Sequence, residues 1–144
     1  MILIDTNVIS ELMRPEPAQA VLDWFARHEP AELFFSAMGE AELRTGVAIL
    51  PAGRRRDRLA ASIDFMIDQD FDGRVLPFDS AAAKAYAAIA ASRRAAGRPI
   101  AEVDCQIAAI ARVRGAALAT RNVRDFNNCG IEIVNPWKGA RPAR

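Results

Sequence analysis

The chain has 144 residues, of which 51% are hydrophobic and 26% are charged. This length and balance predict one globular domain with a buried core, and they exclude a disordered chain. The net charge of +1 gives no global signal for a polyanion, although it does not exclude a nucleic-acid substrate. No apolar stretch approaches the roughly 20 residues of a membrane span, and no signal segment is recognisable, so we expect a cytoplasmic protein without a membrane partner.

Cysteine and histidine offer little to a catalytic site in this sequence. Cys105 and Cys129 form neither a metal-binding pair nor a disulfide framework, and we expect Cys105 to pack as a small apolar residue. The single histidine, His28, ends an expected helix, where it serves the helix dipole or solvent. Any chemistry must therefore come from carboxylates and hydroxyls.

Strand and helix patterns alternate along the chain, which predicts a parallel sheet covered by helices on both faces. The expected strands cover residues 2–4, 33–35, 75–78, 117–119 and 131–134. The expected helices cover residues 8–13, 18–27, 39–50, 54–70, 80–96 and 100–114. No repeat or internal linker interrupts this pattern. We therefore expect a single domain over residues 1–137, followed by a frayed basic tail over 138–144.

Three acids lie at the end of an expected strand or on an expected helix. Asp5 follows the first strand, where it either caps the helix that starts near Asn7 or belongs to a catalytic site. Glu42 lies on an amphipathic helix, where an acid usually faces solvent. Asp104 lies early in its helix, where it complements the dipole. Each residue alone therefore has an ordinary structural explanation.

A fourth polar group follows the fourth strand and changes the interpretation of the other three. Thr120 and Asn122 offer neutral oxygens there, and Asp125 offers a charged one. Strand ends and helix starts of a parallel sheet meet at one edge, so we expect all four groups to converge. Mg²⁺ and Mn²⁺ prefer such oxygen ligands, and a metal-bound water can attack a phosphodiester. The leading hypothesis is a metal-dependent nuclease.

The positive charge is almost entirely arginine, and it is clustered along the chain. The clusters lie at residues 54–58, 93–98 and 121–124. Such runs either bind phosphate through bidentate donors or form solvated helix faces. Arg121 and Arg124 flank the last acidic group, and we expect them to contact phosphate rather than bases.

Taken together, these motifs resemble PIN-domain ribonucleases of the VapC toxin class, and most of all their FitB-like branch. The matching stretches are MILIDTNVISEL, SAMGEAELRTGVAIL, VLPFD, PIAEVDCQIAAIA, LATRNVRDF and NPW. They span the chain from Met1 to about Trp137, and their order and spacing make the resemblance specific. It implies a PIN-like three-layer α/β/α domain with a central, mainly parallel sheet of four or five strands.

The resemblance also implies roles for individual residues. Asp5, Glu42 and Asp104 correspond to acids that the family gathers around Mg²⁺, for which Mn²⁺ can substitute. Asp5 and Asp104 would be direct ligands, and Glu42 would hold or activate water. Many relatives carry an acid directly after the Thr-Arg pair, where this chain has Asn122. Either Asn122 or Asp125 fills this fourth catalytic position, and one metal ion is favoured over two. The candidate neutral ligands or orienting groups are Thr6, Thr120 and Asn122.

The resemblance further implies partners. The chain would be an endoribonuclease toxin and a homodimer, forming a heterotetramer or larger assembly with a small antitoxin. In relatives the antitoxin tail covers the acidic pocket and its other domain binds operator DNA, so DNA contact would come only through the antitoxin. The apolar helical faces around Trp24-Phe25 and Leu59 to Ile67 exceed what a lone small domain needs.

Two other hypotheses compete with the nuclease. The first is a catalytically weak PIN domain that acts as a protein-binding module in transcriptional autoregulation, and Asn122 favours it. The second is an α/β domain whose acids are only helix caps, which the joint spacing of the acids disfavours. The sequence does not specify which RNA would be cut.

Overall fold

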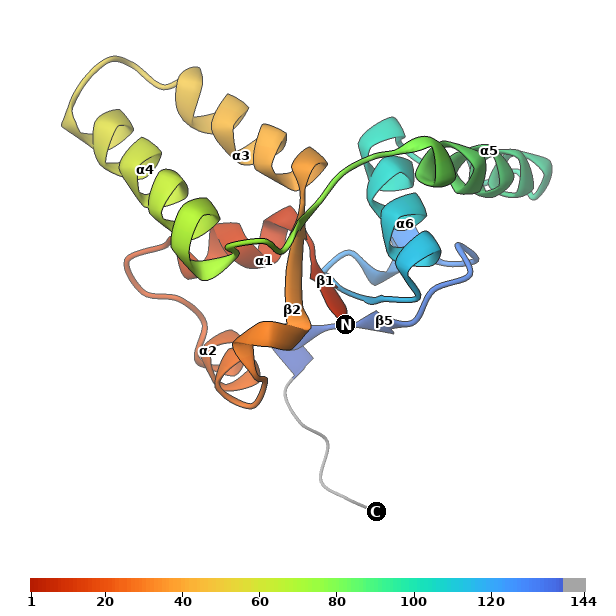
Figure 1. The fold of residues 1–144 in the computed structure, drawn as a ribbon, viewed down its shortest axis with the longest axis horizontal. Helices are drawn as coiled ribbons and strands as arrows, with labels where there is room; N and C mark the ends of the chain where they lie inside the picture. The colour runs from red at the N-terminus through yellow and green to blue at the C-terminus, as the bar shows by residue number, and fades with distance from the viewer. Residues whose placement is uncertain (139–144) are drawn as a thin grey trace.

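The computed structural model, which describes residues 1–138, places a parallel sheet at the centre of the chain (Figure 1). The strand order is β3-β2-β1-β4-β5, so the first strand lies in the middle. The strands are β1 (Ile2–Ile4), β2 (Leu33–Ser36), β3 (Val75–Leu76), β4 (Ala117–Ala119) and β5 (Ile133–Val134). Each neighbouring pair in this sheet is parallel.

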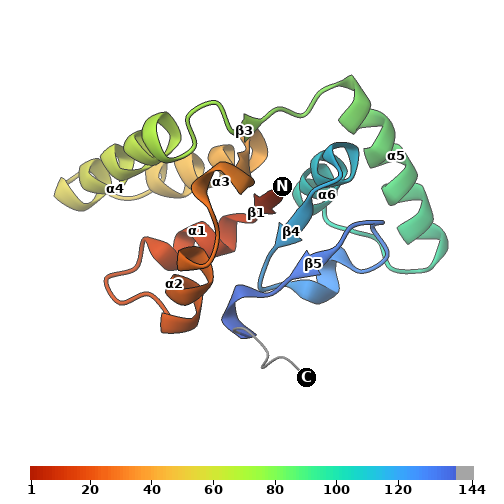
Figure 2. The same cartoon turned by 60° about the horizontal axis from the view of Figure 1, so that its bottom comes forward.

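Helices cover both faces of the sheet, with α1 to α4 on one side and α5 and α6 on the other (Figure 2). The α-helices are α1 (Thr6–Leu12), α2 (Gln19–Ala26), α3 (Ala37–Ala48), α4 (Arg54–Phe65), α5 (Ser80–Ala95) and α6 (Glu102–Arg114). The shorter helical turns are η1 (Pro30–Glu32), η2 (Met66–Asp70), η3 (Val123–Phe126) and η4 (Pro136–Lys138). The predicted three-layer α/β/α architecture with a parallel sheet of four or five strands is confirmed.

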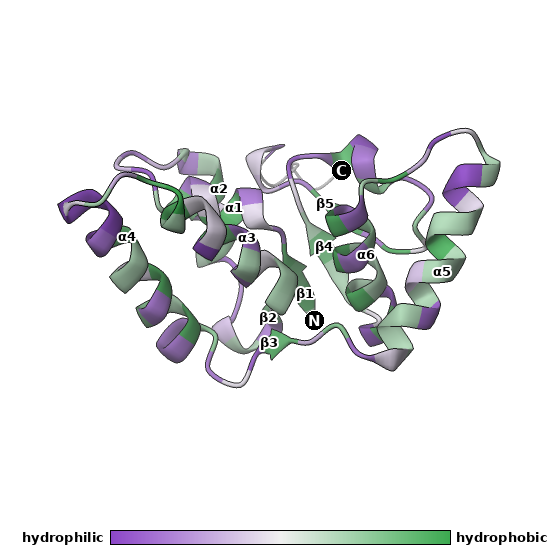
Figure 3. Cartoon of the chain, turned by 90° about the horizontal axis from the view of Figure 1, so that it is seen from above, coloured by the Kyte–Doolittle hydropathy of each residue, from purple (hydrophilic) through white to green (hydrophobic). Residues whose placement is uncertain are grey.

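Two hydrophobic cores lie on opposite faces of the sheet. Successive residues of a strand point to opposite faces, so Leu3 and Ile4 enter different cores. Leu3 packs with Leu118 and with residues of α5 and α6. Ile4 packs with Ala119 and with residues of α1 to α4. β1 and β4 therefore contribute to both cores, and the strands are the hydrophobic centre of the molecule (Figure 3).

Two helices begin earlier than the sequence predicted, because the residue before each is a cap. The Ser36 hydroxyl accepts a hydrogen bond from the Gly39 N–H at 2.9 Å, so α3 begins at Ala37 rather than at 39. The Asp5 carboxylate accepts one from the Thr6 N–H at 2.8 Å, so α1 begins directly after β1. Both helices thus start at the carboxyl end of a strand.

The helix expected over residues 54–70 is not α-helical throughout. α4 ends at Phe65, and the chain continues through one π-helical segment, Met66–Asp70. The Phe71 N–H donates to the carbonyl of Met66, five residues earlier, at 2.9 Å. The wider turn shifts the apolar face, which the regular spacing of the sequence did not indicate.

Other boundaries differ for local reasons. The third strand ends at Leu76 rather than at 78, because Pro77 has no N–H to donate to a neighbouring strand. The fifth begins at Ile133 rather than at 131, since its partner β4 is only three residues long. The last long helix begins at Glu102 rather than at 100, because Ala101 keeps an extended backbone.

The arginine clusters do not share one environment. α4 begins with the first arginine cluster, residues 54–58, and this end of the helix is hydrophilic (Figure 3). Arg93 on α5 is instead buried, which neither a solvated face nor a phosphate site predicts. Its guanidinium donates to the backbone carbonyls of Arg98, Asp125 and Asn127. Arg93 therefore joins α5 to the loop that follows β4.

Within residues 1–138, no helix combines the length and apolar character that crossing a membrane requires. Of the tail predicted over 138–144, Lys138 ends η4, and the remaining residues lie outside the described part of the chain.

The sharing of β1 between two cores predicts a large cost for truncating Leu3, which is 0% exposed. Leu3→Ala is expected to lower the free energy of unfolding by about 3 kcal/mol, measured by urea denaturation. Leu22→Ala is the matched control, because Leu22 is 38% exposed and should cost under about 1 kcal/mol. Equal losses for the two variants would contradict this assignment of the core.

Candidate active site

Asp5 lies at the carboxyl end of β1 and is held by three hydrogen bonds. One carboxylate oxygen accepts the Thr6 N–H at 2.8 Å. The other accepts the Thr120 hydroxyl at 2.7 Å and the Asn7 amide at 3.2 Å. Asp5 is only 5% exposed, yet it lines a cavity. The two roles left open for Asp5 are therefore compatible, since one oxygen caps α1 while the carboxylate also borders the cavity.

Thr120 fixes this arrangement from the end of β4. Its side chain is 0% exposed, and its hydroxyl donates to Asp5. The same oxygen accepts the Asn7 amide at 3.2 Å and the Asn122 N–H at 3.1 Å. Its hydrogen-bonding capacity is thereby used within the protein, so Thr120 orients Asp5 rather than binding a ligand itself. Among the candidate neutral groups, it is a positioning residue.

Glu42 reaches the same place from α3. The Ser36 cap starts α3 at the end of β2, and a Cβ at Gly39 would lie 2.6 Å from the Phe35 ring. Glycine thus permits the close approach of α3 to β2. One oxygen of the exposed Glu42 carboxylate accepts the Thr6 hydroxyl at 2.7 Å. Thr6 therefore links α1 to this acid, and it serves as an orienting group.

Asp104 lies in the first turn of α6 and is partly buried. Burial raises its pKa to about 6, and the nearby charges of Asp5, Asp125 and Glu42 add to this effect, while Arg93 opposes it. Burial also raises the pKa of Asp5, against the hydrogen bonds from Thr120 and Thr6. The two carboxyls thus share a region where negative charge is unfavourable.

One cavity of about 510 Å³ collects most of the predicted residues. Asp5, Glu42, Asp104, Thr6, Asn122 and Arg121 all line it. Asp125 and Arg124 line a neighbouring cavity instead, which shares Arg121 and Asn122 with the first. Of the two residues considered for the fourth catalytic position, Asn122 therefore borders the acids. Asp125 acts on them only through its charge.

Five further residues line this cavity that the sequence did not single out. They are Asn7, Ser10, Glu11, Arg14 and Trp137. Ser10 and Glu11 follow Asn7 by three and four residues, and Arg14 follows them by four and three, so helical periodicity from the Asp-Thr-Asn motif would have found them. Trp137 gives no such signal, because η4 reaches the cavity only through tertiary packing.

Glu11 is a buried acid of the cavity lining, and its contacts give it a structural role. Its carboxylate accepts the Ala18 N–H at 2.9 Å and an Arg14 guanidinium N–H at 3.3 Å. The hydrogen bond from Ala18 lowers the pKa of Glu11, and Arg14 and Arg121 lower it further. Glu11 therefore anchors the segment between α1 and α2.

The candidate ligand atoms around the acids suit a hard divalent cation. They are carboxylate, hydroxyl and amide oxygens, and no basic side chain is paired with Asp5 or Asp104 within residues 1–138. In the same part of the chain, no three His, Cys, Asp or Glu side chains close around one point as a complete metal cage. Mg²⁺ needs no such cage, because one or two carboxylates suffice and water completes its coordination.

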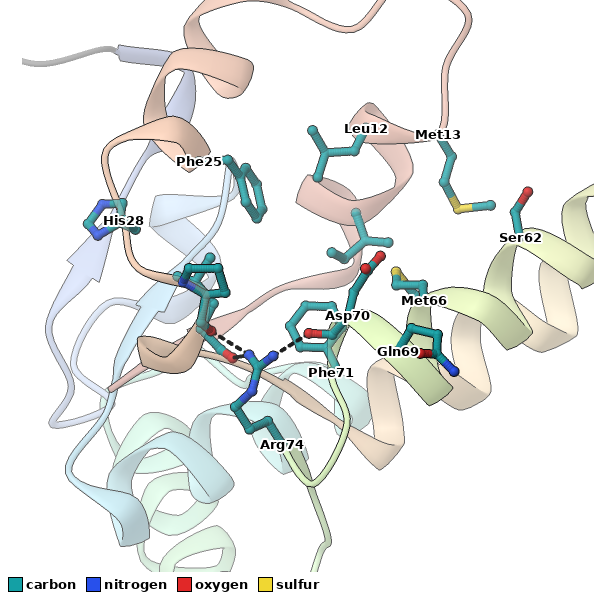
Figure 4. A pocket seen from close by; sticks show the side chains of 13 residues that line it. Leu12, Met13, Phe25, His28, Ser62, Met66, Gln69, Asp70, Phe71 and Arg74 are labelled. Carbon is teal, nitrogen blue, oxygen red and sulfur yellow. Dashed lines mark hydrogen bonds between the residues drawn. The ribbon is translucent and has the colours of Figure 1, made fainter.

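A separate cavity of about 570 Å³ lies between α1, α2 and η2 (Figure 4). Leu12, Phe25 and Met66 surround it. Arg74 at its base donates to the backbone carbonyls of Pro30, Leu33 and Asp70. His28 lines this cavity, with its ring centroid 4.3 Å from that of Trp24. The histidine therefore lies outside the acidic cavity.

The comparisons with known proteins agree with this geometry. A model of the PIN domain family matches residues 2–131, and the chain belongs to that family. It is 44% identical to plasmid stability protein StbB of Pseudomonas syringae pv. tomato (96% of this chain, 99% of that one) and 42% identical to VapC ribonuclease Y4jK of Sinorhizobium fredii (97% and 100%). It is also 39% identical to toxin FitB of Neisseria gonorrhoeae (95% and 99%). The structure of FitAB bound to a DNA fragment matches with a TM-score of 0.90 and 39% identity, over 95% of this chain and 96% of that one. The predicted resemblance to VapC and FitB is thereby confirmed.

The raised pKa of Asp104 predicts a stability that depends on pH. The folded protein holds this proton up to about pH 6, whereas the unfolded chain releases it near 3.8, so stability falls as pH rises through that window. Asp104→Asn should make the fall smaller and give a more stable protein at pH 7, as measured by urea unfolding in EDTA. The exposed control Asp72→Asn should keep the fall of the wild type. Parallel curves for Asp104→Asn and the wild type would refute the effect.

Proposed function

We propose that this chain is a metal-dependent endoribonuclease and the toxin of a toxin–antitoxin pair. The observation that carries the proposal is the convergence of Asp5, Glu42 and Asp104 on one cavity, from three separate elements. Their mutual repulsion, together with the burial of Asp5 and Asp104, favours a bound cation. The name of one relative, VapC ribonuclease Y4jK, supports the ribonuclease activity, and the name of another, toxin FitB, supports the toxin role.

In this proposal Asp5 and Asp104 hold Mg²⁺, or Mn²⁺ in its place. When bound, the ion supplies an acidified water and offsets the charge that builds on phosphorus. Thr120 and the Thr6 N–H keep the Asp5 carboxylate in one orientation. The Thr6 hydroxyl fixes one oxygen of Glu42, which leaves the other oxygen to orient and deprotonate the attacking water. Asn122 adds no charge at the fourth position, so one ion is favoured over two.

The nuclease hypothesis predicts that Glu42→Gln lowers the rate of RNA cleavage by about 10²- to 10⁴-fold, the usual range for a lost general base. Glu40→Gln is the matched control on the same helix, because Glu40 pairs with Arg44 and lies outside the cavity lining. Cleavage of a mixed single-stranded RNA in Mg²⁺, with EDTA as the blank, gives the measurement. Equal rates for the two variants would remove Glu42 from the mechanism.

Asp104→Asn separates the nuclease from the alternative, a catalytically weak PIN domain that binds protein partners. Asn122 favours that alternative, because an asparagine in place of an acid leaves the site with one negative charge fewer. If the chain is a nuclease, this variant should lose both cleavage and Mg²⁺ binding in the millimolar range, measured by calorimetry. A wild type that binds no Mg²⁺ and cuts no RNA would favour the binding module.

We also propose a small antitoxin as the partner, with DNA contacted only through it. FitAB, a complex that includes the related FitB, was solved bound to DNA. The assembly would be a homodimer of this chain that forms a heterotetramer or larger complex with the antitoxin. The apolar cavity around Leu12, Phe25 and Met66 offers the surface that such a partner would bury (Figure 4).

Met66→Gln is expected to weaken antitoxin binding by about tenfold or more, because burying a methionine side chain contributes roughly 1.5–3 kcal/mol. The probe is the purified product of the neighbouring reading frame, measured by calorimetry. Ile49→Gln is the control, since Ile49 is 78% exposed and lines neither cavity. Both variants should cleave RNA like the wild type. Unchanged affinity in Met66→Gln would place the partner elsewhere.

A further inference from the structure

We propose that Arg121 and Trp137 form a stacking subsite for one nucleobase of the RNA, beside the phosphate that is cut. This inference rests on the proposed nuclease function and adds the residues that receive the substrate. Both side chains line the cavity that holds Asp5, Glu42 and Asp104. A nucleotide bound there would have its phosphate at the acids and its base within reach of the pair.

The Arg121 guanidinium lies over the indole of Trp137, with its central carbon 5.1 Å from the ring centroid. This cation–π contact places the guanidinium over the face of the ring. Arg121 is exposed, so a ligand can reach its side chain from solvent. The pair therefore presents an aromatic ring and an exposed positive charge to the cavity.

The donors of this guanidinium are free for a ligand. Within residues 1–138, none of its N–H groups donates to a protein acceptor, and it forms no ion pair. The structural arginines of this chain behave differently, because Arg93 and Arg74 each donate to several backbone carbonyls. Glu11, the acid whose pKa the charge of Arg121 helps to lower, already accepts hydrogen bonds from Ala18 and Arg14.

Hydrogen bonds hold the backbone of both Arg121 and Trp137 in place. The Arg121 N–H donates to the Asn7 side-chain oxygen at 3.3 Å, which ties it to the network around Asp5. Trp137 is partly buried against the core formed with α1 to α4, and its N–H donates to the Asn135 side chain at 3.0 Å. The stacking surface is thus positioned by the same contacts that position the acids.

Single-stranded RNA is recognised largely by stacking its bases on aromatic rings or arginine planes. Such stacking contributes about 1–3 kcal/mol for each base and tolerates base identity. From the sequence we expected Arg121 to contact phosphate only, as Arg124 would. The geometry separates the two residues, because Arg121 lines the acidic cavity whereas Arg124 lines only its neighbour and has no aromatic support among the described residues.

The test uses the full chain and a set of short single-stranded RNAs in which one nucleotide at a time is abasic. For the wild type, kcat/KM should fall about tenfold at one position beside the cut, which corresponds to about 1.4 kcal/mol of lost stacking. Arg121→Lys keeps the charge but loses the plane, so it should lower kcat/KM for intact RNA and show no added loss at that abasic position. Arg124→Lys should keep the abasic sensitivity.

Trp137→Phe and Trp137→Leu provide the second arm, with melting temperatures confirming that both fold. The phenylalanine variant should keep most of the position-specific loss, and the leucine variant should lack it. A uniform loss across all RNAs in Arg121→Lys would make Arg121 a phosphate contact and overturn the subsite, as would an abasic scan without a sensitive position. Equilibrium binding of the same RNAs in EDTA repeats the scan without cleavage. If no RNA is cut, the nuclease function fails, while the binding scan still decides the subsite.

Discussion

The contact between Asp5 and Thr120 is the constraint on which the acidic site depends. It joins the ends of two neighbouring strands through a buried 2.7 Å hydrogen bond between residues 115 positions apart. Asn7 and Asn122 attach to the same threonine oxygen, so α1 and the loop after β4 are located by one atom. A carboxylate with its pKa raised by burial is kept in place by polar neighbours rather than by a basic partner. This arrangement leaves the charge available to a cation.

Much of this fold was predictable because its signals are local. Short apolar runs followed by caps indicate each strand and helix start, and parallel connections place the acids at one edge. For this reason Asp5, Glu42 and Asp104 could be selected from the sequence and lie together in the cavity. The π-helical turn after α4 and the burial of Arg93 could not be predicted, because both depend on tertiary packing.

The details of the site were predictable only in part. Asn7 was noted only as a helix start, although it lies two positions after Asp5, because its role in the site depends on a contact with Thr120, 113 residues away. Asp125 was a reasonable candidate by charge, but the η3 turn points it to the neighbouring cavity. Trp137 depends on how the chain returns after β5. The sequence therefore identified the acids and the threonines that orient them, Thr6 and Thr120, but it did not identify Asn7 or Trp137.

The sharing of β1 and β4 between two cores has a consequence for how the site responds to mutation. Glu42 belongs to the helices of one core, whereas Asp104 belongs to the other, and Asp5 stands on the strand between them. The acidic cavity thus lies where the helices of the two hydrophobic cores meet. A substitution deep in either core that shifts its helices would therefore alter the spacing between the acids without contacting them.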